Sequence, residues 1–229
     1  MRTKFVLLLA LIALTVNAQQ DVKDVSVNQI PTEMKIKGNV VSAISYKDSY
    51  GLNYIIQTET ALLTPKSAVE AAKKYELINV NGRVDTIRDV VSDYRIKGLF
   101  VYHYTQNNDS VNLLWKNLDN VTDCSYKYLK GEYLTKPLVT DLDNNGVAEV
   151  WLIYQLGCRD TTTVPLGMKL VLYQDKNAYV IRGMRQTLHA SEKEIQELES
   201  AVKADPGFNN LHPAIQNYAR ELWNKYKKE

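Results

Sequence analysis

Apolar and polar residues alternate along much of the chain, which is the pattern of half-buried β-strands. Two such runs, over residues 35–46 and 52–60, flank the turn-forming segment 47–51 and predict a hairpin. A second hairpin is predicted where YRIKGLFVYHYTQ and SVNLLWKNLDNV lie on either side of residues 107–109. Aromatic residues occupy strand positions in both of these runs, which supports the strand assignment.

Further segments extend the strand pattern. Residues 76–88 contain Asn81 and Gly82 between alternating apolar residues, and Asn-Gly is the strongest short hairpin signal because both residues tolerate positive φ. Residues 147–156 form a largely apolar run that is expected to pair with MKLVLYQ, residues 168–174. NAYVIRGMRQT, which follows, predicts a last short pair of strands.

Helical spacing replaces strand spacing in the C-terminal part. Ser191 and Glu194 form a capping box, which predicts a helix over about residues 191–203. A second helix is predicted over residues 213–228, where apolar side chains recur every three or four positions and should pack on a sheet. An earlier short helix is predicted over residues 65–75, from a first-turn proline and several alanines.

These patterns predict a mainly β protein of the α+β class, with antiparallel, hairpin-rich sheets and a C-terminal helical element. Residues 19–34 are polar and contain a proline, so we expect an N-terminal tail that leads into the fold. Residues 35–229 are expected to form one domain, because no repeat, low-complexity segment or clear linker precedes about residue 190.

The first 18 residues have the features of a secretory signal peptide. Arg2 and Lys4 precede an unbroken apolar run, and Val16 and Ala18 place small residues before a cut at Gln19. A membrane anchor is the alternative, but the run is shorter than the roughly 20 residues of a spanning helix. The mature chain is therefore expected to be exported, periplasmic or at the cell surface or secreted, with no membrane span after cleavage.

The charge balance narrows the classes of partner. The chain has 28 Lys and Arg residues and 26 Asp and Glu residues, and removal of Arg2 and Lys4 makes the two numbers equal. A strong excess of basic residues favours nucleic-acid binding and docking on anionic lipid, and the mature chain has no such excess. Both classes of partner are disfavoured.

Two cysteines, Cys124 and Cys158, lie in the mature chain. In an exported protein an even pair is interpreted as a disulfide. In the chain-entropy model, closing the loop between these two cysteines would stabilise the folded state by about 3–4 kcal/mol. Two free buried thiols or a two-thiolate metal site are the alternatives, although no CxxC or HxxxH motif completes such a site.

The segment DLDNNGVAE has the spacing of a calcium loop. Asp141, Asp143 and Asn145 supply alternate oxygen-bearing side chains, the Val147 carbonyl offers a further ligand, and Glu149 closes the loop. Calcium is a hard cation that prefers six to eight oxygen ligands. The loop is not an EF-hand, because both flanks are strand-like and no glutamate stands at the twelfth position.

The spacing of this loop resembles the calcium loops of integrin-type β-propeller blades. The alternative is a β-turn without metal, because Asp, Asn and Gly are common turn residues and Asx side chains cap their own backbone. If calcium binds, a structural role is expected, because the ligands are close together in sequence and no nucleophile is nearby.

Catalytic residues are not identified from the sequence. The three histidines, His103, His189 and His212, do not fall in HExxH or any other catalytic motif, and His103 is expected to be a strand residue. Fifteen tyrosines against three phenylalanines favour a solvated sheet face, since tyrosine joins an apolar ring to a polar hydroxyl. Stacking of tyrosines on sugars is the alternative.

Several segments, in order, resemble those of a known bacterial family. They are IPTEMKIKGNVVSAISYKDSYGLNYIIQTET, YHY, LLWK, the residues around Cys124, TDLDNNGVAEVWLIY, MKLVLY, YVIRG and YARELWNKY. The chain resembles small exported Gram-negative proteins catalogued as surface polysaccharide biosynthesis proteins. The resemblance covers essentially the whole mature chain and implies a role in making or presenting envelope glycans, without implying catalytic residues.

The favoured hypothesis is a non-enzymatic accessory protein of surface polysaccharide biogenesis, stabilised by calcium and partnered by an envelope glycan or envelope proteins. A glycan-active hydrolase or transferase is one alternative, which a pair of carboxylates at glycosidase spacing would favour. A surface interaction or adhesion module is the other, which an exposed aromatic patch would favour.

Overall fold

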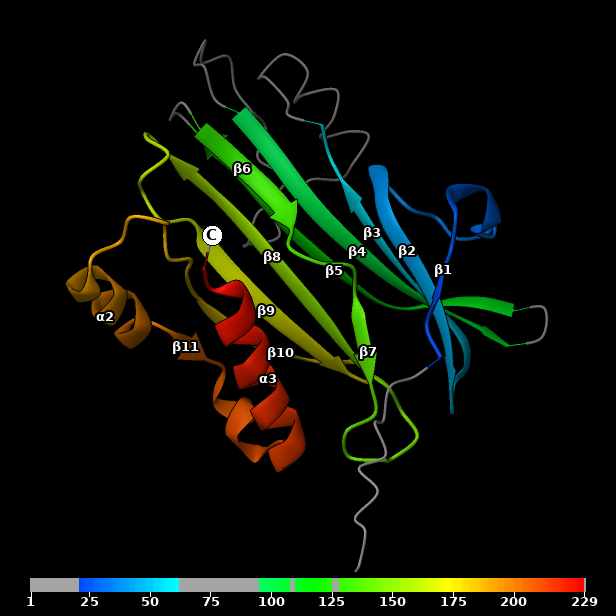
Figure 1. Ribbon diagram of the computed structural model, residues 1–229. Coiled ribbons are helices and arrows are strands. Elements are labelled where there is room, and N and C mark those ends of the chain that lie inside the picture. The colour runs from blue at the N-terminus through cyan, green and yellow to red at the C-terminus, as the bar shows by residue number, and fades with distance from the viewer. Residues whose placement is uncertain (1–20, 62–94, 108–109, 125–127, 229) are drawn as a thin grey trace, which may run out of the picture.

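The computed structural model describes residues 21–61, 95–107, 110–124 and 128–228. Its strands form two antiparallel sheets, which confirms the predicted fold class (Figure 1). The first sheet has the order β1-β2-β3-β4-β5, with bounds Lys23–Asp24, Asn39–Asp48, Gly51–Glu59, Arg95–Asn107 and Ser110–Cys124.

The second sheet has the order β11-β10-β9-β8-β6, and the short strand β7 also pairs with β8. In chain order the bounds are β6 Tyr128–Tyr133, β7 Leu138–Thr140, β8 Glu149–Arg159, β9 Gly167–Gln174, β10 Asn177–Met184 and β11 Lys203–Ala204. Two α-helices, α2 (Glu192–Ser200) and α3 (Pro213–Tyr226), lie near the C-terminus.

The two sheets pack face to face and share a core. The first sheet contributes Ile44, Tyr46, Ile55, Leu99, Val101 and Trp115. The second contributes Val139, Val150, Leu152, Tyr154, Val171 and Tyr173, and Ala148 joins them from the loop before β8. Tyr133 of β6 also joins the sheets, because its hydroxyl lies 3.0 Å from the carbonyl oxygen of Thr58 and 2.8 Å from that of Phe100. The result is a β-sandwich.

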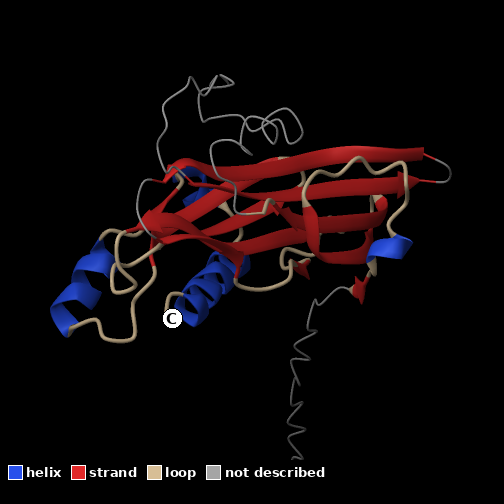
Figure 2. Ribbon diagram, turned by 90° about the horizontal axis from the view of Figure 1, so that it is seen from above, coloured by secondary structure: helices blue, strands red, loops and turns tan. Residues whose placement is uncertain are grey.

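Helix α3 covers the outer face of the second sheet (Figure 2). Its buried residues Ile215, Ala219, Leu222 and Trp223 lie in one cluster with β8, β9 and β10, as the apolar periodicity predicts. Strand β8 is therefore buried on both faces, since its alternate side chains enter this cluster and the sandwich core. That double burial explains why its sequence is apolar without alternation.

The N-terminal residues cover the outer face of the first sheet. Strand β1 pairs with β2, and Met34, Val25 and Ile30 pack in a cluster with Ile56 and other residues of that face. Residues 21–34 thus contact the fold along their length, whereas their polar composition suggested only a leading tail. Val25, Ile30 and Met34 make these contacts, whereas Val27 is exposed.

Three of the predicted strand pairs in the described ranges are present. Strands β2 and β3 form the first hairpin, β4 and β5 the second, and β8 pairs with β9. The prediction of a strand pair within NAYVIRGMRQT is wrong, because the segment contains a single strand, β10, which pairs with β9 and β11. Ser191 caps α2, with Glu194 completing the capping box. The helix predicted over 65–75, the hairpin over 76–88 and the signal peptide over 1–18 lie outside the described residues.

The expectation that the tyrosines form a solvated sheet face is wrong for a large group of them. Five tyrosines are buried: Tyr46, Tyr102, Tyr104, Tyr154 and Tyr173. Their hydroxyls have internal partners; for example, Tyr104 donates to the Lys35 carbonyl at 2.8 Å and Tyr154 donates to Asp119 at 3.0 Å. The phenolic group lets these side chains fill a core that also contains polar atoms.

Cys124 and Cys158 form the predicted disulfide, with an S–S distance of 2.03 Å. The bond joins the end of β5 in the first sheet to β8 in the second. In the described part of the chain, none of the helices has the length and apolar character needed to span a bilayer.

Candidate metal centre

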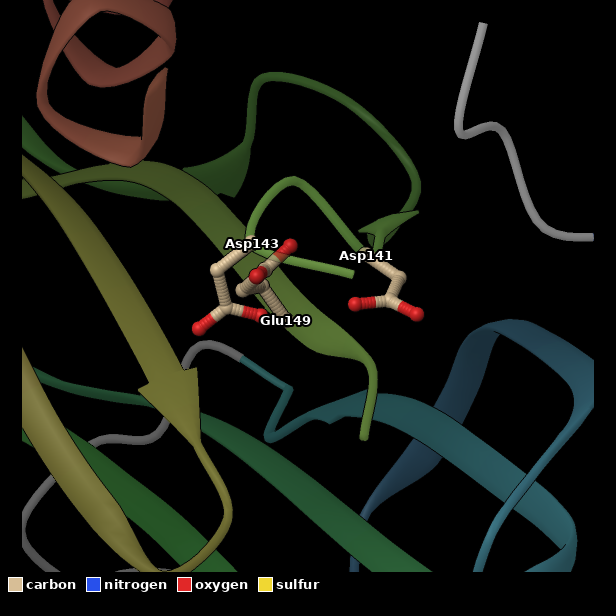
Figure 3. Close-up of side chains that lie close together, drawn as sticks. All are labelled: Asp141, Asp143 and Glu149. Atoms are coloured by element: carbon tan, nitrogen blue, oxygen red, sulfur yellow. The ribbon is translucent and has the colours of Figure 1, made fainter. Parts of the chain in front are cut away.

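The acidic loop connects β7 to β8 at one end of the sandwich. Thr140 and Glu149 are paired across these two strands, so the strand register fixes both ends of the loop. Figure 3 shows the side chains of Asp141, Asp143 and Glu149 grouped together. One oxygen from each of these carboxylates lies within 4.8 Å of the others, as the spacing of the motif predicts.

Backbone conformation and side-chain acceptors shape the loop. Asn144 and Gly146 have φ values of 54° and 80°, the left-handed region that permits a tight reversal. The two oxygens of Asp141 accept from the amides of Asn145 and Gly146, at 3.0 and 3.1 Å. A Cβ added at Gly146 would meet no atom within 4 Å, so glycine is favoured there for its backbone freedom alone.

The other two predicted ligands are placed differently. The side-chain oxygen of Asn145 accepts from the Val147 amide at 2.7 Å, and its side-chain nitrogen donates to Asp143 at 2.9 Å. Asn145 therefore braces the loop rather than joining the group of three carboxylates. Val147 contributes through its backbone amide in this arrangement.

Glu149 is completely buried at the start of β8. Its carboxylate accepts from the Thr140 hydroxyl at 2.7 Å and from the Leu142 amide at 2.9 and 3.1 Å. Burial raises the pKa of the Glu149 carboxyl, and the charges of Asp143 and Asp141 add to that effect. The hydrogen bonds from Thr140 and Leu142 oppose it.

Within the described ranges, no lysine or arginine forms an ion pair with any of the three carboxylates. The group therefore concentrates negative charge, with one acid buried, and the described residues place no paired cation against it. An ionised carboxylate has about four lone-pair directions, so Glu149 keeps acceptor capacity beyond its two donors. An all-oxygen set of this kind suits a hard divalent cation such as calcium.

A recess lies beside the loop, between β1, the segment before β7, and α3. Its volume is about 650 Å³, and Leu142 of the loop forms part of its wall. Tyr218 and Glu221 line it from α3. Lys136, from the segment before β7, also lines it and forms an ion pair with Asp24. The sequence did not indicate this recess, because its walls come from distant segments.

The histidines do not join the acidic loop. His103 is buried in β4, as its strand position suggested, and its Nε2 lies 2.8 Å from the Asn53 side-chain oxygen. His212 is exposed and caps α3 by accepting from the Ala214 amide at 3.3 Å, and His189 is exposed. Cys124 and Cys158 are held in the disulfide and offer no thiol.

In comparisons with known proteins, no protein-family model, no curated protein and no solved structure matches the chain.

Proposed function

We propose that this chain is an exported, non-enzymatic accessory protein of envelope glycan biogenesis whose loop 141–149 binds calcium as a structural ion. The observation that supports the calcium part is the group of three carboxylates, with oxygens within 4.8 Å of one another and one of them buried. A divalent cation at this point would offset their mutual repulsion and the cost of burying Glu149. Asp141, Asp143 and Glu149 would hold it.

Calcium is expected to raise the melting temperature of the mature chain, residues 19–229. A ligand that binds only the native state adds about 2.7 kcal/mol at 100 times its dissociation constant, or roughly 5–10 °C for a chain of this size. The measurement is thermal unfolding in added calcium and in excess chelator. Equal melting temperatures in the two conditions would contradict a calcium site and leave the loop as a turn.

Variants of the loop make this test specific. Asp141→Asn with Asp143→Asn removes two charges and leaves one accepting side-chain oxygen at each position, so the calcium-dependent rise should disappear. The loss of one backbone hydrogen bond at Asp141 lowers stability in calcium and in chelator alike and does not affect the comparison. Asp160→Asn is the matched control, because Asp160 is an exposed acid outside the loop. The control should keep the full calcium-dependent rise.

The glycan part of the proposal is supported by the family resemblance and by the recess beside the loop. Tyr218 offers an aromatic ring, and Lys136 and Glu221 offer charged groups, which together suit a polyhydroxylated ligand. The disulfide is compatible with export.

Purified surface polysaccharide is expected to bind the chain without release of reducing ends. Binding would be measured by calorimetry, with Tyr218→Ala as the weakened variant and the exposed Leu188→Ala as the control. A steady release of reducing ends would contradict the non-enzymatic part and favour a glycan hydrolase. No binding by the wild-type chain would contradict the glycan part.

A further inference from the structure

The turn between β2 and β3, in the first sheet, contacts the acidic loop of the second sheet directly. The Ser49 amide donates to the Gly146 carbonyl at 2.9 Å. The Ala148 amide donates to the second side-chain oxygen of Asp48 at 3.2 Å. Asp48 and Ala148 are 100 positions apart in the chain, so these bonds join the two sheets at the end where the loop lies.

Asp48 is surrounded by donors on both sides of its carboxylate. Its first side-chain oxygen accepts from the Tyr50 amide at 2.9 Å and from the Asn53 side chain at 2.7 Å. Its second oxygen accepts from Ala148. Only a carboxylate of this length accepts on both sides, since an asparagine would turn a donor toward one set of these N–H groups.

Two of the residues that donate to Asp48 are themselves held in place, Asn53 by burial and Tyr50 by a hydrogen bond. Asn53 is completely buried, and besides Asp48 it donates to the Gly51 carbonyl at 3.0 Å, while its oxygen meets His103. Tyr50 is tied to a third turn, because its hydroxyl donates to Asp175 at 2.9 Å. The carboxylate of Asp48 is therefore held in place by its own donors, and it fixes the Ala148 amide through the hydrogen bond between them.

The consequence for the loop follows from sequence order. Ala148 directly precedes Glu149, so the bond to Asp48 fixes the backbone from which the buried carboxylate of the loop projects. Asp143 is braced separately, because Gln174 donates to it at 2.7 Å from the end of β9. The loop is thus held in place from both sheets.

We propose that Asp48 is a positioning residue for the metal loop, and that calcium binding and the closure of this end of the sandwich are coupled through Asp48. The proposal rests on the proposed calcium function. Removing a group that orients a metal ligand through a hydrogen bond commonly lowers the metal affinity about 10–100-fold. Calcium should in turn protect the β2–β3 turn, although that turn supplies no ligand.

The experiment compares the wild-type chain with Asp48→Ala, Asp48→Asn and Asp24→Ala. Asp24 carries the same charge on the same sheet but pairs with Lys136 and not with loop 141–149, so it controls for the loss of one negative charge. Calcium affinity is measured by titration calorimetry. We expect about 10–100-fold weaker binding for both Asp48 variants and an affinity within about twofold of wild type for Asp24→Ala.

Amide exchange measured by NMR at Ser49 and Ala148 gives a second readout. In the wild-type chain, calcium is expected to slow exchange at both amides, and in Asp48→Ala it should no longer slow exchange at Ser49. A purely structural role would lower stability equally with calcium and with chelator, leaving affinity unchanged. That result, or full recovery of affinity in Asp48→Asn, would overturn the proposal.

The two failures are distinguishable. A wild-type chain that binds no calcium would end the proposed calcium function and the coupling with it. A wild-type chain and an Asp48→Ala chain that bind calcium equally would end only the role of Asp48.

Discussion

Replacing Trp151 with alanine is expected to lower the free energy of unfolding by about 4 kcal/mol, as large aromatic truncations in cores do. Trp151 is completely buried in β8, beneath α3. Its ring meets Tyr218 edge to face, with 5.2 Å between the ring centroids. The substitution would leave a cavity between the sheet and the helix.

The same side chain reaches the acidic loop. The indole nitrogen of Trp151 donates to the Thr140 hydroxyl at 2.8 Å, and Thr140 donates to Glu149. Trp151→Phe is the matched control, because it keeps most of the ring packing and removes this hydrogen bond, at a cost of about 1–2 kcal/mol. Urea unfolding measures both variants. A loss below about 1 kcal/mol for Trp151→Ala would mean that α3 does not pack on β8 as described.

Acid is expected to destabilise the chain through His103 by as much as about 5 kcal/mol between pH 7 and pH 3. Burial lowers the pKa of His103 from 6.5 to about 3, and the charge of Asp175 opposes that shift. The ring lies between Trp115, with centroids 4.9 Å apart, and Tyr46, with centroids 6.1 Å apart.

The sign of the pH effect follows from proton binding. Between pH 6.5 and about 3 the unfolded chain binds a proton at His103 and the folded chain does not. Stability therefore rises with pH across this window, and it falls as acid is added. Because the Nδ1 atom has no hydrogen-bond partner among the described residues, a proton placed there would meet no acceptor from them.

The measurement is the free energy of unfolding against pH for the wild-type chain and for His103→Gln. The glutamine has no charged form and offers an amide to Asn53, so its profile should be flatter by the contribution of His103. The difference between the two profiles isolates this group from the carboxyl groups, which titrate in both chains. Parallel profiles would show that His103 is protonated without cost, contrary to its burial.

Local signals in the sequence predicted much of this fold. The turn around Ser49 and the polar residues after β4 predicted two hairpins because turn chemistry acts over a few residues. The apolar periodicity around Ile215 predicted both helix α3 and its packing on a sheet. Residues 141–149 predicted the loop and its group of carboxylates, because alternate side chains in a tight reversal point to one side.

Other features depend on contacts between distant segments, which no local pattern encodes. Asp48 looks like an ordinary turn aspartate in the sequence, and only the packing of the sheets brings it to Ala148. The role of Asn145 was also predicted incompletely, because an amide can accept from the backbone as easily as it can face an ion. His103 and Asn53 meet only because β3 and β4 are adjacent.

The disulfide has a topological consequence for the loop. Cys124 and Cys158 close a covalent ring of chain, and the loop 141–149 lies inside that ring. A single peptide-bond cleavage within the loop would therefore leave the N-terminal and C-terminal fragments joined through sulfur. The most exposed part of the candidate metal centre can be cut by a protease without separating the two halves of the molecule, as long as the bond stays oxidised.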